Sequence, residues 1–177
     1  ALEFNKDKKT TKTLRAEISG MQEIITALLD TERLAAGSNL EKIPVEKITA
    51  AICREFKVRL NGAVQGATID GSTEKLRIAL RNVIENALKH GKKPVEVRIS
   101  EEASFIALRV LDAGPGIPAA EREKVFLPFY RSGNAAKHGY GLGLYMTKKI
   151  VESMRGKISI VESLERSTVE ILLPRAR

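Results

Sequence analysis

The sequence predicts an α+β fold, a two-layer α/β sandwich in which helices cover one face of a mixed, largely antiparallel sheet, preceded by a long N-terminal coiled-coil or bundle helix. Helical and strand patterns mix along the chain, and neighbouring strand patterns are joined as hairpins rather than by regular strand–helix–strand alternation. The chain has 177 residues, of which 43% are hydrophobic and 29% charged, and this composition can fill the core of one domain of ordinary size.

The first predicted element is a helix whose apolar residues repeat at alternating spacings of four and three. Glu32 interrupts the repeat, and Gly37 with Ser38 ends it. A single helix cannot bury such a stripe, so we expect a second helix or a second subunit against it. We therefore divide the chain into a helical segment, 1–38, and a domain, 39–177. The stripe consists of Leu14, Ile18, Met21, Ile25, Leu28 and Ala35, widened by Ile24 and Leu29.

The domain contains three longer helical patterns and four clear strand patterns. The second helix has the strongest boundary signals, because Ser72 or Thr73 can cap its start and Gly91 can end it. Gly156 ends the third. In chain order we expect a helix at 45–60 after a turn with Pro44, a short strand with a turn at 62–71, a helix at 73–90, strands at 95–100 and 105–112, a helical fragment at 119–126, a helix at 141–155, and a hairpin of strands at 157–163 and 168–174.

The composition restricts the classes of partner. The net charge is +8, but the basic residues are scattered and aromatic residues make up only 5%. This pattern favours a basic solvated surface over a nucleic-acid interface, so no nucleic-acid partner is expected, although some cations could meet a polyphosphate ligand.

The apolar runs are too short to span a bilayer and no signal peptide opens the chain, so we expect a soluble piece. The single cysteine, Cys53, occupies an apolar helical position and is predicted to be a small core residue.

Two glycine clusters indicate either sharp turns or places where a ligand approaches the backbone closely. Asp112 follows a predicted strand directly and precedes Gly114 and Gly116. A carboxylate in this setting can accept a hydrogen bond from a ligand's amino group while a flat ring lies over the glycines. The second cluster immediately precedes a helix, where unobstructed amide groups are suited to polyphosphate; it consists of Gly139, Gly141 and Gly143.

A pair of asparagines points to a polar site on the helix at 73–90. Asn82 and Asn86 are four residues apart, so their amides share one helix face. Helix interiors do not favour asparagine, and Lys89 and His90 follow closely. Asn86 could supply an oxygen to a hydrated Mg²⁺, which prefers few protein ligands together with phosphate oxygens.

Several common nucleotide motifs are excluded. The sequence has no G-x-x-x-x-G-K-[ST] loop, and it lacks the H-R-D and D-F-G motifs of protein kinases. Residues 114–119, GPGIPA, formally fit a dinucleotide-binding pattern, but Pro118 stands where that fold would begin its helix interior.

Four stretches resemble the N, G1, F and G2 boxes of sensor histidine kinases, in the order and at the spacing of that family: NVIENALKHG, LDAGPGIP, VFLPFYRSG and GYGLGLYMTKKIVE. The resemblance covers about residues 40–175 and implies the Bergerat-type ATP-binding fold shared with gyrase, Hsp90 and MutL. The segment MQEIITALLDTERLAAG resembles the second helix of the family's dimerisation and histidine-phosphotransfer hairpin.

The resemblance implies a role for each matching residue. Asp112 would bind the adenine amino group, Asn86 would ligate Mg²⁺, and Arg131 would contact the γ-phosphate. Phe126 and Phe129 would anchor a lid spanning roughly 117–140. Asn86, Lys89 and Arg131 would serve catalysis, and the full nucleotide-binding set would be Asn82, Asn86, Lys89, His90, Asp112, Gly114, Gly116, Ile117, Tyr130, Gly139, Gly141, Leu142, Gly143, Leu144 and Thr168. Thr168 matches a threonine that helps to hold the adenine-binding aspartate, although the family's usual Gly-Thr is Ser-Thr here.

One position separates transfer of phosphate from hydrolysis. Family members resembling gyrase carry a glutamate one helical turn before the Mg²⁺ asparagine, as the base for the attacking water. Asn82 occupies that position here and cannot act as a base near neutral pH. Glu85 precedes Asn86 directly but points about 100° away on the helix. The site is therefore expected to hold ATP for transfer.

The phosphoacceptor histidine of the family is not found in this sequence. The only histidines are His90, in the N box, and His138, in the lid, and neither is followed by an acidic residue on a bundle helix. We expect the chain to bind Mg·ATP without labelling itself, and to transfer phosphate in the intact protein to a histidine elsewhere, for relay to an aspartate of a response regulator receiver domain. The resemblance also implies a homodimer through the helical hairpin and a cytoplasmic domain, and it leaves open whether the intact protein is anchored in the bacterial inner membrane.

Three alternatives remain at this point. One is a serine kinase of the anti-sigma type on the same fold, which the F box and the long N-terminal helix oppose. A second is a degenerate, nucleotide-free scaffold, which the intact boxes oppose. A nucleic-acid-binding module is the third, and strong duplex binding at physiological salt would favour it.

Overall fold

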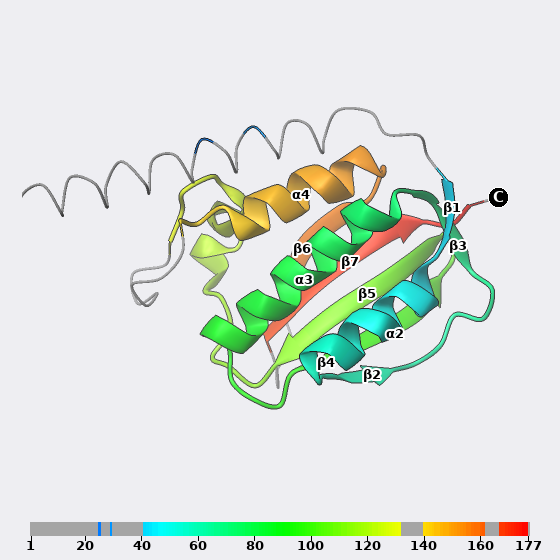
Figure 1. Cartoon of the computed structure of the whole chain (residues 1–177). Helices are drawn as coiled ribbons and strands as arrows, with labels where there is room; N and C mark the ends of the chain where they lie inside the picture. The colour runs from blue at the N-terminus through cyan, green and yellow to red at the C-terminus, as the bar shows by residue number, and fades with distance from the viewer. Residues whose placement is uncertain (1–24, 26–28, 30–40, 132–139, 162–166, 177) are drawn as a thin grey trace, which may run out of the picture.

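The computed structural model describes residues 25, 29, 41–131, 140–161 and 167–176. Its domain has two layers, with three α-helices packed on one face of a five-stranded sheet (Figure 1). The elements are β1 Glu41–Pro44, α2 Val45–Phe56, β2 Arg59–Asn61, β3 Thr68–Gly71, α3 Thr73–His90, β4 Glu96–Glu102, β5 Phe105–Asp112, the 3₁₀ turns η1 Ala119–Glu121 and η2 Lys124–Phe126, α4 Gly143–Ser153, β6 Lys157–Val161 and β7 Ser167–Pro174.

The main sheet has the strand order β2-β4-β5-β7-β6, and β1 with β3 forms a separate two-stranded sheet. β2 runs parallel to β4, while the other three pairs of the main sheet are antiparallel. This arrangement confirms the predicted α+β sandwich with a mixed, largely antiparallel sheet. β5 is the central strand, so Asp112, its last residue, lies near the middle of the side of the sheet where the strand ends meet the loops.

The core lies between the sheet and the helices, and alternation along the strands explains its composition. On β5, Ile106, Leu108 and Val110 belong to the core cluster, whereas Arg109 on the opposite face pairs with Glu170 of β7. α3 runs across the core and contributes a continuous apolar stripe; its fully buried members are Leu76, Ala79, Leu80, Val83 and Ile84. This burial fixes the position of α3 on the sheet. It therefore also fixes the positions of the polar residues on the other faces of α3.

The predicted boundaries of α3 are confirmed. The Ser72 hydroxyl accepts a hydrogen bond from the Lys75 amide at 3.4 Å, and the Gly91 amide donates to the Ala87 carbonyl at 3.0 Å. These bonds satisfy backbone groups that a helix end leaves without partners. Cys53 is buried as predicted, and desolvation raises the pKa of its thiol to about 11.

Three local predictions were wrong. The helix expected at 45–60 ends at Phe56, because Lys57 adopts a left-handed conformation and the Val58 amide closes onto the Cys53 carbonyl at 2.9 Å. Pro44, expected in a turn, is the last residue of β1, which pairs with β3. The helical fragment expected at 119–126 is two separate 3₁₀ turns, η1 and η2.

Little of the predicted N-terminal helix falls within the described residues. Ile25 and Leu29 have helical backbone, and their side chains are 54% and 55% exposed. The other members of the predicted stripe lie outside the described residues, as do the predicted boundary at 38 and the loop residues His138 and Gly139. Within the part of the chain that is described, no helix combines the length and the apolar character needed to cross a membrane.

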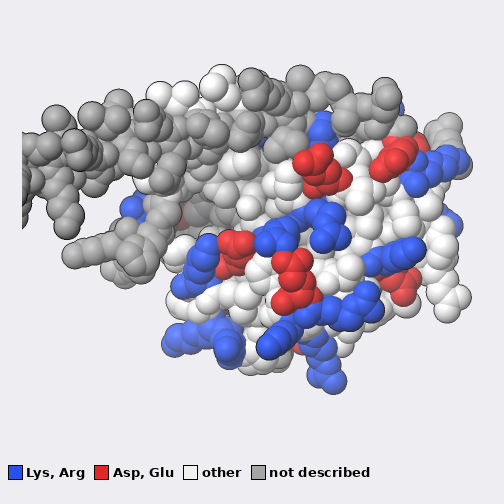
Figure 2. Space-filling model, in the orientation of Figure 1, with Lys and Arg blue, Asp and Glu red and all other residues white. Residues whose placement is uncertain are grey.

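The charged surface is mixed in sign on the face that carries α2 and α3. Figure 2 shows acidic side chains interspersed among the basic ones there. Glu55 of α2 pairs with both Arg77 and Arg81 of α3, and Arg81 also lies over the ring of Phe56 at 5.2 Å. Such alternating pairs are typical of a solvated helix surface.

Candidate functional site

Asp112 is a buried carboxylate at the end of the central strand. Only 6% of the residue is exposed. Its Oδ1 accepts hydrogen bonds from the backbone amides of Gly114 at 2.7 Å and Lys92 at 3.4 Å. These two backbone donors satisfy an oxygen that burial removes from water. Both bonds use Oδ1, so among the described residues the second oxygen keeps its capacity to accept from a ligand.

Two glycines allow the chain to approach this carboxylate closely. A Cβ on Gly91 would lie 2.3 Å from both Cγ and Oδ1 of Asp112, and one on Gly114 would lie 2.5 Å from Oδ1. Gly116 has a different role, because a Cβ there would meet open space but its φ of +78° favours glycine. The loop after α3 and the loop after β5 therefore converge on Asp112, and they are further joined by the Ala113 amide, which donates to the Lys92 carbonyl at 2.8 Å.

The two asparagines lie half-buried on α3, as predicted. The Asn82 side-chain amide reaches the Gly143 carbonyl of α4 at 3.5 Å, at the limit of a hydrogen bond. Asn86 makes no side-chain hydrogen bond to any residue that the structure describes, so its amide oxygen can act as a ligand. Glu85 forms an ion pair with Lys89 at 2.8 Å, a contact typical of residues four apart on a helix.

The start of α4 lies against this face of α3. Its N-cap residue, Leu142, makes no side-chain capping bond, and a Cβ on Gly143 would meet open space. The first-turn amides of α4 thus have no side chain capping them, and they carry the positive end of the helix dipole. Thr147, which the sequence analysis missed, is fully buried and donates to the Gly143 carbonyl at 2.8 Å.

Backbone contacts join residues 129–130 to Gly141, just before α4. The Phe129 amide donates to the Gly141 carbonyl at 3.1 Å, and a Cβ on Gly141 would lie 2.6 Å from the Tyr130 carbonyl oxygen. Phe126 is 5% exposed and packs under α4, as predicted for an anchor, but Phe129 is 48% exposed. The prediction that both rings anchor this segment is therefore wrong for Phe129, which contributes through its left-handed backbone instead.

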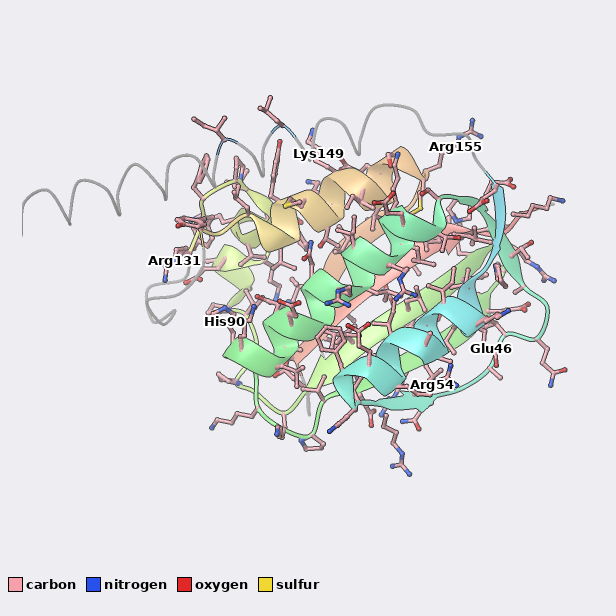
Figure 3. All side chains as sticks on the ribbon, viewed as in Figure 1. Glu46, Arg54, His90, Arg131, Lys149 and Arg155 are labelled. Carbon is pink, nitrogen blue, oxygen red and sulfur yellow. The ribbon has the colours of Figure 1, made fainter. Side chains whose placement is uncertain are left out.

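The remaining predicted residues lie around this framework. Ile117 is half-buried, and Leu142 and Leu144 pack inward at the start of α4. Burial and the carboxylate of Glu121, which accepts a hydrogen bond from the Tyr130 hydroxyl, raise the pKa of Tyr130. His90 ends α3, and Figure 3 shows it on the same side of the molecule as Arg131, with both side chains exposed.

The register of β5 and β7 distinguishes Ser167 from Thr168. Ser167 lies directly opposite Asp112, whereas Thr168 lies opposite Leu111. Because neighbouring residues of a strand face opposite sides of the sheet, Ser167 shares the face of Asp112 and Thr168 lies on the other. The register thus favours Ser167, which the sequence analysis passed over, as the strand residue nearest to Asp112.

These groups define a site along the C-terminal half of α3, with a carboxylate at one end and uncapped amides beside Asn82 at the other. The described residues contain no group of three His, Cys, Asp or Glu side chains that could hold a metal ion. A cation here would need the Asn86 oxygen together with oxygens of the ligand, and this is the pattern that Mg²⁺ accepts.

The domain matches a family model. The model described as "Histidine kinase-, DNA gyrase B-, and HSP90-like ATPase" matches residues 71–177, more than half of the chain. The adaptive-response sensory kinase SasA of Synechococcus sp. (strain JA-2-3B'a(2-13)) is 28% identical over 178 residues, which cover 90% of this chain and 47% of that protein. The chain thus spans less than half the length of this relative.

Solved structures give the same result for the fold. The mycobacterial sensor histidine kinase MprB superposes with a TM-score of 0.66 at 26% identity, over 77% of this chain and 97% of that chain. Full-length ShkA in complex with AMPPNP superposes with a TM-score of 0.69 at 21% identity, over 96% of this chain and 39% of that chain, and this likeness shows the fold alone.

Gly141→Ala should destabilise the protein more than Gly66→Ala. Both glycines have a φ of +70°, but a Cβ on Gly66 would meet open space. Left-handed strain alone should cost about 1 kcal/mol at Gly66, whereas the collision with the Tyr130 carbonyl should raise the cost at Gly141 to about 2–4 kcal/mol. Urea unfolding curves of the two variants measure the difference, and equal losses would show that the segment before α4 adjusts freely.

Proposed function

Because the chain belongs to the family of histidine kinase-, DNA gyrase B- and HSP90-like ATPases, and its domain is the ATP-binding catalytic domain of the sensor kinase type, we propose that it holds Mg·ATP and presents the γ-phosphate to a histidine of the intact protein. The observation that supports this proposal is the buried carboxylate of Asp112, which backbone amides hold in place. It lies at one end of the site along α3, and the uncapped start of α4 lies at the other end.

Asp112 would select adenine. The 6-amino group of adenine is a hydrogen-bond donor, and the carboxylate is an acceptor whose position is already fixed by two amides. A guanine base presents an oxygen acceptor at the same place, and two facing acceptors repel. Gly114 and Gly116 leave room for the flat ring beside the carboxylate, and Ile117 supplies an apolar neighbour.

The triphosphate would extend along α3 to α4. Asn86 would supply an oxygen to Mg²⁺, with Asn82 beside it, and Mg²⁺ would neutralise phosphate charge when bound. Gly141 and Gly143, with Leu142 and Leu144 between and after them, would present backbone amides to the phosphates. The exposed side chains of Lys89, His90 and Arg131 would lie at this end, where Lys89 and Arg131 would add positive charge; Lys89 must leave Glu85 to do so.

The site favours transfer over hydrolysis. Asn82 occupies the position one turn before Asn86, and an amide cannot accept a proton from an attacking water at neutral pH. Catalysis would therefore come from positioning and charge neutralisation, with the acceptor histidine supplied by a segment other than this domain. In the intact protein we propose a homodimer formed through its helical hairpin, acting in the cytoplasm and passing phosphate to a response regulator receiver domain.

Asp112→Asn should weaken binding of ATP and ADP by about tenfold to a hundredfold. The substitution replaces a charge-assisted hydrogen bond, worth about 1.5–3 kcal/mol, with an amide that can present a donor to the adenine amino group. Isothermal calorimetry measures the affinities, and Asp70→Asn, an exposed aspartate on β3, is the matched control. Unchanged affinity in Asp112→Asn would reject this assignment, and failure of the unaltered protein to bind at millimolar nucleotide would favour a nucleotide-free scaffold.

Asn86→Ala should remove most of the Mg²⁺ dependence of ATP affinity. For the unaltered protein we expect affinity to fall by about tenfold when EDTA replaces Mg²⁺, because the cation links the Asn86 oxygen to the phosphates. In the variant, the two affinities should converge near the EDTA value. Gln65→Ala removes an exposed amide from a loop and should behave like the unaltered protein. A variant that keeps the full Mg²⁺ effect would place the metal ligand elsewhere.

A chimera tests the transfer reaction. Residues 39–177 would be joined to the histidine-bearing hairpin of a sensor kinase that the chain resembles, and incubated with γ-labelled ATP. We expect acid-labile label on the hairpin histidine, abolished by Asp112→Asn, while the 177-residue chain alone stays unlabelled. Label on His90 or His138 of the chain alone would contradict the view that the acceptor lies elsewhere.

A further inference from the structure

Lys75 is a buried cation that the proposed chemistry does not use. It lies in the first turn of α3, and the residue is only 4% exposed. Its Nζ donates to the Ser153 hydroxyl at 3.3 Å, and no carboxylate among the described residues forms an ion pair with it. A buried ammonium group needs hydrogen-bond acceptors in place of water, and the Ser153 hydroxyl supplies one of them.

The group that Lys75 meets is the C-terminal end of α4. Ser153 is the last residue of α4, and its hydroxyl donates in turn to the Ile150 carbonyl at 2.7 Å. Beyond it the helix closes through the Gly156 amide, which donates to the Val151 carbonyl at 2.9 Å. The last carbonyls of a helix carry the negative end of its dipole, so the ammonium of Lys75 lies where a helix favours a cation.

Among the described residues, two side-chain hydrogen bonds join α4 to α3, one at each end. Asn82 reaches Gly143 at the start of α4, and Lys75 reaches Ser153 at its end. Positions 75 and 82 are about two turns apart on α3. The two helices run antiparallel (Figure 1), and buried side chains of both helices pack in the core. The Asn82 contact measures 3.5 Å and the Lys75 contact 3.3 Å, and the Lys75 contact lies at the end of α4 remote from the uncapped amides.

We propose that Lys75 is a positioning residue for the triphosphate half of the nucleotide site, acting through Ser153 and α4; this inference rests on the proposed function. A helix of 11 residues behaves as a short rod, so loosening its C-terminal end lets its N-terminal end shift relative to Asn82 and Asn86. Hydrogen bonds from the first-turn amides to phosphate oxygens weaken steeply with such shifts. The contacts at Asp112 do not involve α4 and stay as they are.

The test compares two ligands that share the adenosine and differ in the phosphates with their Mg²⁺. Lys75→Met, Lys75→Arg and Ser153→Ala would be titrated with Mg·ATP and with adenosine in calorimetry. We expect Lys75→Met to weaken ATP binding by about tenfold while adenosine affinity stays within twofold of the unaltered protein. Lys75→Arg keeps a cation of similar reach and should restore ATP affinity, and Ser153→Ala should show the same selective loss as Lys75→Met at smaller size.

The outcomes separate this inference from the proposed function. If the unaltered protein binds both ligands, nucleotide binding stands; a normal ratio of ATP to adenosine affinity in Lys75→Met, with only a lower melting temperature, would then overturn the role of Lys75. Equal losses for both ligands would also overturn it, because a general structural role predicts them. If Lys75→Met does not fold, Ser153→Ala decides: an unchanged ratio rejects the proposal and a reduced ratio supports it.

Discussion

The burial of one carboxylate, that of Asp112, sets the constraints on the rest of the site. A carboxyl group that is 6% exposed needs hydrogen bonds, and here they come from the Gly114 and Lys92 amides. Those amides can approach only because positions 91 and 114 lack a Cβ. The end of α3 is thereby fixed to the end of β5. Asn86 lies just over one turn before Gly91 on α3, so the same contacts also fix its position.

The site consequently has two halves of different character. The half around Asp112 is defined by the sheet and by short backbone contacts, which leave little freedom. The half around α4 depends on a packed helix whose N-terminus has no capping side chain and whose preceding segment is joined through Gly141. A ligand that bridges both halves would gain affinity from the first and supply acceptors to the second, where no described side chain caps the helix.

The sequence predicted features that depend on local pattern. The 3.6-residue period and the caps at Ser72 and Gly91 defined α3, and strand alternation placed Asp112 at a strand end. Features that depend on strand register or on contacts between residues far apart in sequence were missed. A shift of one residue decides whether Ser167 or Thr168 faces Asp112, and only the register of β5 with β7 settles it. The contact of Lys75 with Ser153 joins positions 78 apart in sequence, beyond the reach of any periodicity.

The Glu85–Lys89 pair shows how weak surface contacts can serve such a site. Both side chains are partly exposed, so the pair contributes at most about 1 kcal/mol, and a phosphate could draw Lys89 away at small cost. Doing so would release the Glu85 carboxylate beside Asn86 but on a different helix face. The freed carboxylate would then point away from the Asn86 oxygen, which we propose as the cation ligand. Helix geometry therefore directs the Glu85 carboxylate away from the side of α3 that carries Asn86, as expected for the proposed site that holds ATP for transfer.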